Sequence, residues 1–372
     1  MILEARSINI LKEKLHNWSF SFLSPFLLLG VMAIASCGDR TSVTYPQNKR
    51  AISGEAQGTT YNIVYFTEEI RMEKHRVDSL LDEIDLAASV WVDSSVISRF
   101  NQSTENPFEL TKTTNAYFLD NFFLCKEVYK NTNGAYNPTV GALVNAWGFG
   151  FKNKENMDSS KVDTLLRSVG FADNQLQLII PNAGNPFITK SNPNTQLDYN
   201  GIAQGYSVDV LAEFFKNNGI DNFMIEIGGE LIANGRKSDG SFWKIGIDKP
   251  TDGNLGRQLA ATIKLDSMAV ATSGNYRKFY EKDGVKYAHT IDPFTGFPVQ
   301  HSLLSVTVAM ANCGLADAYA TSFMVMGYEK AKALIASKPE LGIEAYFIYN
   351  DEDGNYQTYF TPGLEKSLSE LE

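Results

Sequence analysis

The sequence predicts an α+β fold for most of the chain. Segments with helical apolar spacing are mixed with short runs of β-branched and aromatic residues, and they follow no regular βαβ repeat. No internal repeat of fixed period occurs, and no Pro/Gly-rich linker divides the chain. Of the 372 residues, 44% are apolar and 20% are charged, which is typical of a globular protein with a sizeable core.

The first strand is predicted over residues 59–66, where β-branched and aromatic residues gather. A helix is expected over residues 69–90, because apolar residues recur there at helical spacing: Val77, Leu80, Leu81, Ile84 and Ala88. A second amphipathic helix covers residues 115–132. A third covers residues 205–218 and ends at Gly219, as a helix stop should.

The remaining elements follow from the same two patterns. Residues 151–175 are predicted to be a polar insertion with a helix near 162–169. Further strands are expected over residues 222–227, 243–248, 259–265, 305–310 and 344–349, and further helices over residues 315–326 and 328–337.

Composition excludes several classes of function. The 33 Lys and Arg against 43 Asp and Glu give a net charge of −10, which disfavours non-specific binding of nucleic acid or anionic lipid. The chain lacks the HExxH, CxxC, Walker A, GxGxxG and GxSxG motifs. The usual motifs of a zinc hydrolase, a P-loop NTPase and an α/β-hydrolase are therefore absent. Cys125 follows Phe122-Phe123-Leu124 on an apolar helix face and is expected to be buried. A disulfide between Cys125 and Cys313 stays an alternative in an oxidising compartment.

The first residues are predicted to be a signal peptide. Residues 17–38 carry no charge and are strongly apolar, and Arg6, Lys12 and Lys14 precede them. The run is also nearly long enough for an uncleaved transmembrane anchor. Residues 34–37, I-A-S-C, resemble the bacterial lipobox and favour a lipoprotein signal over residues 1–36.

This interpretation sets the expected organisation and location of the protein. A lipidated Cys37 would hold the chain at the membrane on the periplasmic or extracytoplasmic side. Residues 37–53, which are polar and lack an apolar period, are expected to be a tether. Residues 54–372 then form the functional domain.

A metal site in this chain would most readily use oxygen ligands. There are four histidines and three cysteines, so the available donors favour Mg²⁺ or Ca²⁺. Asp317 and Thr321 are four residues apart on a predicted helix, and they share a face on which both could meet one cation. The alternative is an acid near a helix N-terminus beside an unrelated core threonine.

Glycine clusters stand at the ends of several predicted elements. Glycine lets backbone amides approach a phosphate closely, although turns require glycine too. The clusters are Asn200-Gly201, Gln204-Gly205, Gly228-Gly229-Glu230 and residues 272–275.

Six motifs follow one another along the chain. They are G-E-A-Q-G-T at residues 54–59, S-V-W-V-D-S-S-V-I-S-R-F-N at 89–101, G-A-Y-N-P-T-V-G at 134–141 with W-G-F-G at 147–150, L-D-Y-N-G-I-A-Q-G-Y at 197–206, H-T-I-D-P-F-T-G-F-P at 289–298, and A-D-A-Y-A-T at 316–321. In this order they resemble the motifs of the ApbE family of flavin transferases, from residue 54 to about residue 342.

The resemblance implies both a fold and an activity. The fold would be a mixed, largely antiparallel sheet with packed helices, related to the T-fold. The activity would be Mg²⁺-dependent: FAD is cleaved, AMP is released, and FMN is attached through a phosphoester to a threonine of another protein. Two other uses of the same pocket stay open, namely an FAD pyrophosphatase and a flavin-binding or storage lipoprotein.

The resemblance also assigns roles to residues. Asp317, Thr321 and the backbone carbonyl of Gly201 would hold Mg²⁺, and His289 would be the catalytic base. The positions matched to FAD contacts are Gln57, Trp91, Ala135, Tyr136, Asn137, Asp198, Gln204 and Ile291. Three of these depart from the family pattern, because Gln57 replaces a methionine, Asn137 an aspartate, and Gln204 a lysine or an acid. Trp91 and Tyr136 have flat faces on which the rings of FAD could stack.

The acceptor is expected to be a different protein. The family modifies a threonine in a context that resembles Asp-Gly-x-Thr, whereas Asp239-Gly240 is followed here by serine and phenylalanine. Thr295 lies inside a motif that is expected to build the active site, so it could not be the acceptor for that same active site. The resemblance therefore implies acceptors that are exported subunits of membrane redox complexes.

Overall fold

Eight antiparallel strands form the central sheet of the computed structural model, which describes residues 44–371 apart from 111–114, 151–154, 156, 251–257, 276–278, 283–284 and 289. The strand order is β1-β2-β6-β7-β10-β13-β14-β15, and every neighbouring pair is antiparallel. The strands are β1 (Asn48–Ala56), β2 (Thr59–Thr67), β6 (Asn222–Ile227), β7 (Glu230–Asn234), β10 (Met268–Gly274), β13 (Leu303–Met310), β14 (Glu344–Asn350) and β15 (Tyr356–Phe360). They confirm the predicted class, a mixed α+β fold with a largely antiparallel sheet.

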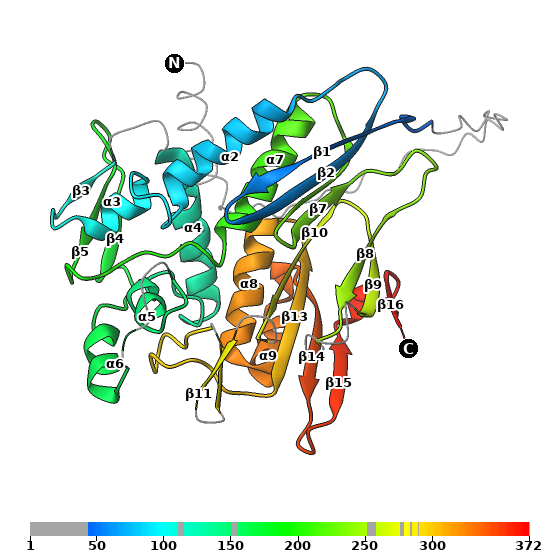
Figure 1. Cartoon of the computed structure of the whole chain (residues 1–372). Coiled ribbons are helices and arrows are strands. Elements are labelled where there is room, and N and C mark those ends of the chain that lie inside the picture. Colours follow the sequence, from blue (N-terminus) through cyan, green and yellow to red (C-terminus); the bar gives the residue numbers. More distant parts are fainter. Residues whose placement is uncertain are drawn as a thin grey trace, which may run out of the picture. The chain divides into compact units, whose positions relative to one another are not determined.

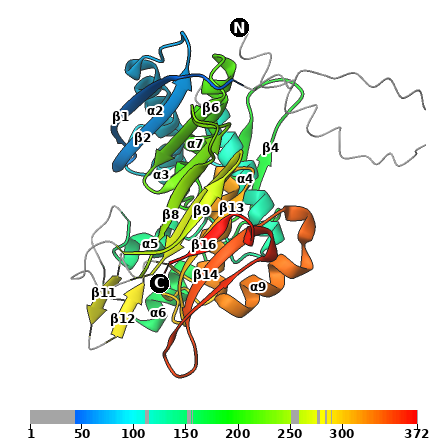
Figure 2. The same ribbon diagram turned by 90° about the vertical axis from the view of Figure 1, so that its right-hand side faces the viewer.

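Helices cover one face of this sheet, and a small second sheet covers part of the other face (Figures 1 and 2). The helices are α2 (Lys74–Ala88), α7 (Ala203–Asn217), α8 (Cys313–Met326) and α9 (Tyr328–Ser337). The small sheet has the order β16-β9-β8, with β8 (Trp243–Asp248), β9 (Leu259–Leu265) and β16 (Leu368–Glu370). Side chains alternate between the two layers, as the period of a strand requires. On β2, Tyr61 and Ile63 pack with α2 and α7, and Phe66 packs with Trp243 of β8.

Helix α8 lies at the centre of the helical layer. Ten of its 14 residues are buried, and it contacts α7, α9, β10, β13 and α4 (Asn115–Asn131). Its N-terminus is capped by Asn312, whose Oδ1 accepts a hydrogen bond from the Leu315 amide. A helix apolar on all sides can only be stable when buried, so its one carboxylate, Asp317, is carried into the interior.

The other described elements are short. They are α3 (Val96–Gln102), α5 (Gly141–Ala146), α6 (Ser159–Leu166), the three-stranded sheet of β3 (Phe108–Glu109), β5 (Phe187–Lys190) and β4 (Leu176–Ile179), the hairpin of β11 (Phe279–Lys282) and β12 (Val285–Ala288), and two single 3₁₀ turns at Pro339–Leu341 and Pro362–Leu364. The helix expected near residues 162–169 corresponds to α6. The sequence patterns missed the others, because two to seven residues are too few to establish a period.

Strand β1 differs from expectation. It begins at Asn48, inside the range 37–53 that the sequence analysis assigns to a tether. Ile52 is the one buried residue of β1, so no apolar alternation marks it as a strand. It pairs with β2 as an edge strand of the sheet. Cys125 and Cys313 are both buried and free, so the disulfide alternative is not realised.

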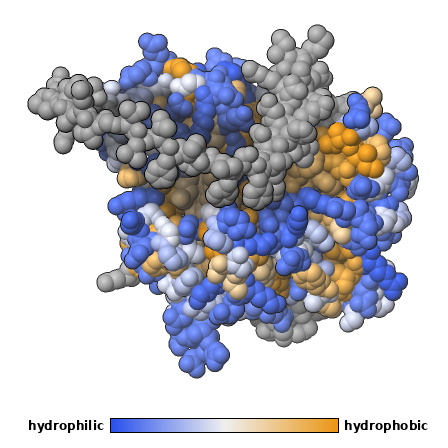
Figure 3. Space-filling model, turned by 180° about the vertical axis from the view of Figure 1, so that it is seen from behind, coloured by the Kyte–Doolittle hydropathy of each residue, from blue (hydrophilic) through white to orange (hydrophobic). Residues whose placement is uncertain are grey.

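The described residues include no helix that is both long and apolar enough to cross a membrane. On the face seen in Figure 3, hydrophilic residues alternate with smaller hydrophobic patches outside the grey atoms. Such a mixture is ordinary for the surface of a folded protein.

Candidate functional site

The predicted metal ligands come together where α8 crosses the start of α7. Asp317 and Thr321 are one turn apart on α8, so their side chains share a face. Gly201, just before α7, packs against Thr321, since a Cβ on Gly201 would lie 3.1 Å from the Thr321 Oγ1. The Oγ of Ser273 on β10 lies 3.5 Å from the same Oγ1. Residues from three separate segments therefore meet beside the Thr321 hydroxyl.

The Asp317 carboxyl is buried, with 6% of the residue exposed. The Gly205 amide lies 3.4 Å from its Oδ2, at the long limit of a hydrogen bond. Burial raises the pKa of Asp317 well above its usual range, and the negative charge of Glu230 raises this pKa further. A cation beside the carboxylate would act in the opposite direction and favour the ionised form.

These donors fit Mg²⁺. Across the described ranges, no three His, Cys, Asp or Glu side chains gather into a group that could hold a metal ion. An ion at Asp317 would therefore rest on one carboxylate and on neutral oxygens from Thr321 and Gly201. Mg²⁺ is commonly held by one or two carboxylates together with substrate phosphates, so the donor set is suited to an ion shared with a pyrophosphate.

Gln57 and Gln204 meet at the first turn of α7. Gln57 and Gly58 form the β1–β2 turn with left-handed φ values of 54° and 72°, as a two-residue hairpin turn requires. The Gln57 Nε2 donates to the Ser207 Oγ at 2.7 Å, and the Gln204 Nε2 donates to the Gln57 carbonyl at 3.5 Å. Burial raises the pKa of the neighbouring Asp85 to about 6, and a hydrogen bond with Gln57 partly opposes this rise.

Tyr136 and Asp198 lie on the α8 side of the site. Tyr136 is 4% exposed, and its hydroxyl is 3.5 Å from the Cys125 Sγ. Burial raises the pKa of the Tyr136 hydroxyl well above its usual range, and negative charge on Asp317 and Asp198 adds to the rise. The pKa of Asp198 is also raised by burial, while its Oδ1 accepts the Asn200 amide at 2.8 Å. Ala135, next to Tyr136, is buried too.

Trp91 and Tyr136 are exposed to very different extents. Trp91, just after α2, is 61% exposed. Tyr136 instead belongs to the largest core cluster. Asn137 forms a local turn in which its Oδ1 accepts from both the amide and the hydroxyl of Thr139. Asparagine keeps the acceptor that this turn needs, so the local structure tolerates the departure from aspartate.

Ile291 begins a tightly held loop. It is buried against Leu143 and Trp147, and it pairs with Pro298 in an antiparallel bridge. The Trp147 Nε1 donates to the Gly296 carbonyl at 2.8 Å. His289, the predicted base, lies outside the described residues, as does Cys37.

Sequence reasoning overlooked three polar residues near the metal ligands. Ser273 and Glu230 belong to glycine clusters that were singled out for the glycines, and the side chains beside them went unnoticed. Asp209 stands within α7 with no local motif. Its Oδ1 and Oδ2 accept the Cys313 and Gly314 amides, each at 2.8 Å, a contact that spans more than 100 residues of sequence.

The chain is similar to known proteins of one family. A family model described as "ApbE family" matches residues 57–347. An FAD:protein FMN transferase of Vibrio cholerae is 33% identical over 95% of this chain and all of its own length. The corresponding protein of Haemophilus influenzae is 32% identical over 88% of this chain and 94% of its own length.

Two solved structures superpose on most of the chain. The flavin transferase ApbE from Vibrio cholerae matches with a TM-score of 0.74 and 33% identity, covering 87% of this chain and 100% of that one. The apo form of the flavinyl transferase ApbE from Pseudomonas stutzeri matches with a TM-score of 0.73 and 30% identity, covering 87% and 98%.

Proposed function

The chain belongs to the ApbE family, and on that premise we propose that it is a Mg²⁺-dependent FAD:protein FMN transferase. FAD is the substrate, AMP is released, and FMN becomes attached through a phosphoester to a threonine of an acceptor protein. One observation carries the proposal for this chain: Gly201 lies beside Thr321 of α8, one turn from the buried Asp317, although Gly201 is more than 100 residues away in the sequence. Together the three residues offer oxygen donors suited to Mg²⁺.

The reaction exchanges one P–O bond for another. The acceptor threonine gives its proton to His289 as its oxygen bonds to the FMN phosphorus. The bond from this phosphorus to the AMP phosphate breaks, and AMP leaves with the electron pair. Asp317, Thr321 and the Gly201 carbonyl would hold Mg²⁺, which when bound neutralises charge on the pyrophosphate.

The other matched residues would bind and orient FAD. The largely exposed Trp91 has a flat indole that suits stacking on an aromatic ring of FAD. Gln57 and Gln204 offer neutral amides at the start of α7, beside the Gly228-Gly229 turn. Ala135, Tyr136, Asn137, Asp198 and Ile291 complete the proposed surroundings of the flavin. The amides of Gln204 and Asn137 replace charged groups of the family pattern, so we expect FAD to be held here by hydrogen bonds more than by charge.

The acceptors that we propose are exported subunits of membrane redox complexes. A lipidated Cys37 would hold the enzyme on the extracytoplasmic side of the membrane, where such subunits are found. The absence of a threonine in the Asp239-Gly240 context supports transfer to another protein.

One assay tests the proposal and separates it from the alternatives. The purified chain without its signal peptide is incubated with FAD and Mg²⁺, with and without an acceptor domain that carries the threonine motif. AMP together with a covalently fluorescent acceptor supports the transferase. AMP with free FMN in both reactions would instead indicate a pyrophosphatase, and unchanged bound FAD would indicate storage.

The Asp317→Ala variant tests the metal assignment in the same assay. Removal of the one carboxylate at the site should abolish Mg²⁺-dependent transfer, a loss of several kcal/mol of transition-state stabilisation on the scale of metal catalysis. Asp163→Ala is the matched control, because it removes an exposed carboxylate from α6 and should leave the rate unchanged. Full activity of Asp317→Ala would show that the metal is held elsewhere.

A further inference from the structure

Asp209 joins α7 to the first turn of α8. The first amides of a helix have no partner within the helix. In α8, the Cys313 and Gly314 amides donate to the two carboxylate oxygens of Asp209, at 2.8 Å each. The next two amides, of Leu315 and Ala316, donate to the side chain and carbonyl of Asn312. Half of the N-terminal amides of α8 are therefore held by a residue of another helix.

Glycines bring the two helices into backbone contact at the same place. A Cβ on Gly205 would lie 2.4 Å from the Cys313 carbonyl oxygen. A Cβ on Gly314 would lie 3.2 Å from the backbone nitrogen and Cα of Tyr206. Because backbone meets backbone here, a small shift of one helix along the other would create a clash, so the contact has one favoured register.

The contacts form a single row along the two helices, which run in opposite directions. Asp209 meets Cys313 and Gly314. One turn earlier on α7, Gly205 meets Asp317. Gly201 precedes the helix and meets Thr321, one turn further along α8. A displacement at the Asp209 end is therefore transmitted to both predicted metal ligands.

We infer that Asp209 is a positioning residue for the metal site. Its carboxylate fixes the register of α8 against α7 and so places Asp317 and Thr321 opposite Gly205 and Gly201. Asp209 itself contacts neither the metal nor the flavin in this inference. The inference rests on the proposed function, because that function assigns Mg²⁺ to Asp317 and Thr321.

Asp209→Asn tests the inference, with Asn312→Ala as the matched control. Asparagine has a similar shape, but its NH₂ group would face one of the two amides and leave that amide without an acceptor. Asn312→Ala also weakens the N-terminus of α8, but it removes a contact within α8 and not one between the helices. The measurements are Mn²⁺ binding by electron paramagnetic resonance in the presence of FAD, hydrogen exchange of the Cys313 and Gly314 amides, and the midpoint of thermal unfolding.

In Asp209→Asn we expect the dissociation constant for Mn²⁺ to rise by about tenfold or more, as for the loss of an outer partner of a metal ligand. Exchange of the two amides should become faster. Asn312→Ala should lower the unfolding midpoint and keep the Mn²⁺ affinity. Equal losses of Mn²⁺ affinity in the two variants would mean general fraying of α8 and would overturn the inference.

A second variant tests the same contact between α7 and α8. If Asp209→Asn does not fold, Gly314→Ala tests the same register from the α8 side, and it too should weaken Mn²⁺ binding. Wild-type protein that binds no Mn²⁺ with FAD would contradict the proposed function itself, and the inference with it. Normal Mn²⁺ binding by both wild type and Asp209→Asn would contradict the inference alone.

Discussion

At the scale of single residues, the surroundings of a carboxylate decide its role more than its spacing does. Asp317 and Thr321 have a spacing that is common on helices. Asp317 is distinguished by its burial and by the nearby charge of Glu230, which together make ionisation costly unless a cation is present. Asp209 is half-buried, and its two oxygens accept hydrogen bonds from backbone amides. These contacts give Asp209 a structural role.

His289 is predicted to act in transfer more than in FAD binding. A base removes the proton of the acceptor hydroxyl, so His289→Ala should lower the rate of transfer by roughly 10²–10⁴-fold. The dissociation constant for FAD, measured by fluorescence titration, should change much less. A variant that binds FAD poorly yet transfers FMN normally at saturation would contradict this role.

The stability of the protein should respond to the pH through Asp209. Burial raises the pKa of this carboxyl from 3.8 to about 6, against the opposing effects of the Cys313 and Gly314 amides and of Lys216. A folded-state pKa above the unfolded one means that the folded state binds the proton more tightly. The protonated Asp209 therefore contributes about 3 kcal/mol to the free energy of unfolding. This contribution is fully present below about pH 4 and is lost as the pH rises through 6.

Urea unfolding of wild type and Asp209→Asn between pH 4 and 7.5 measures this contribution. As the pH rises, the free energy of unfolding of the wild type should fall relative to that of Asp209→Asn. Subtraction of the two curves removes the effects of the other buried carboxyls. A difference that stays constant with pH would contradict the raised pKa.

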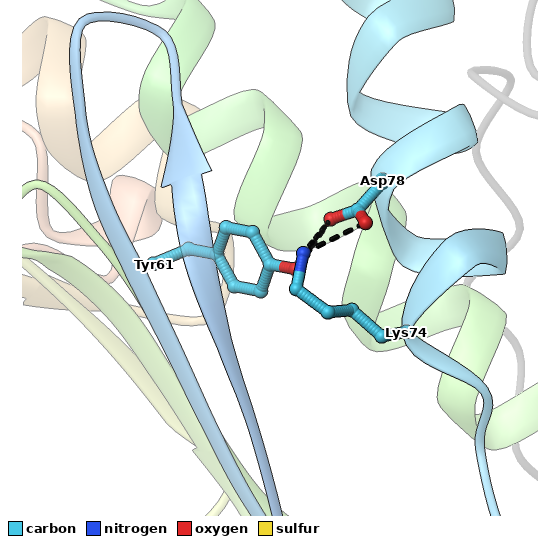
Figure 4. A network of polar contacts seen from close by, with 3 residues as sticks. All are labelled: Tyr61, Lys74 and Asp78. Atoms are coloured by element: carbon cyan, nitrogen blue, oxygen red, sulfur yellow. Dashed lines mark hydrogen bonds and ion pairs between the residues drawn. The ribbon is translucent and has the colours of Figure 1, made fainter.

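At the scale of elements, the β1–β2 hairpin is attached to α2 by a buried tyrosine. Tyr61 of β2 lies opposite Gly54 of β1, and a Cβ on Gly54 would come within 2.6 Å of its ring. The Tyr61 hydroxyl donates to the Asp78 Oδ1 at 2.5 Å, and the Lys74 Nζ is 2.7 Å from both Asp78 oxygens (Figure 4). Gly54 thus makes room for the ring, and the hairpin carries Gln57 to the start of α7.

The variants Tyr61→Phe and Lys74→Met measure separately how much the buried hydrogen bond and the exposed ion pair contribute to stability. Tyr61→Phe should lower the free energy of unfolding by about 1.5 kcal/mol, because it removes a hydrogen bond to a charged group. Lys74→Met should cost much less than Tyr61→Phe, since an exposed (i, i+4) ion pair contributes little to stability. Urea unfolding of the two variants and the wild type measures both losses. A larger loss in Lys74→Met than in Tyr61→Phe would contradict this account.

At the scale of the whole molecule, lipidation of Cys37 would decide where the enzyme works. We predict that Cys37 carries lipid, so Cys37→Ser should move the protein from the membrane fraction of its native host to the soluble fraction or block its processing. Mass spectrometry of the wild-type N-terminus provides the direct check. An intact Met1 terminus or an unmodified Cys37 would contradict the prediction.

Local patterns in the sequence determined much of this protein. The helical period of apolar residues predicted α2, α4, α7, α8 and α9, and β-branched runs predicted β2, β6, β8, β9, β13 and β14, because these signals act between near neighbours. The motifs indicated the family, and the match over residues 57–347 confirms it. Strands β1, β7 and β10 were missed. β1 is an almost wholly exposed edge strand, and β7 and β10 are buried in continuous runs without the two-residue alternation.

Only the tertiary structure decided how the site is assembled. Gly201 and Thr321 are 120 residues apart in the sequence, and they meet because glycines let the backbones of α7 and α8 touch. No local period encodes that contact, and none encodes the Asp209 contact with α8. The charge of Glu230 beside Asp317 likewise depends on where β7 begins beneath α8. Spacing can place two donors on one face of a helix, but packing between distant segments decides what lies opposite them.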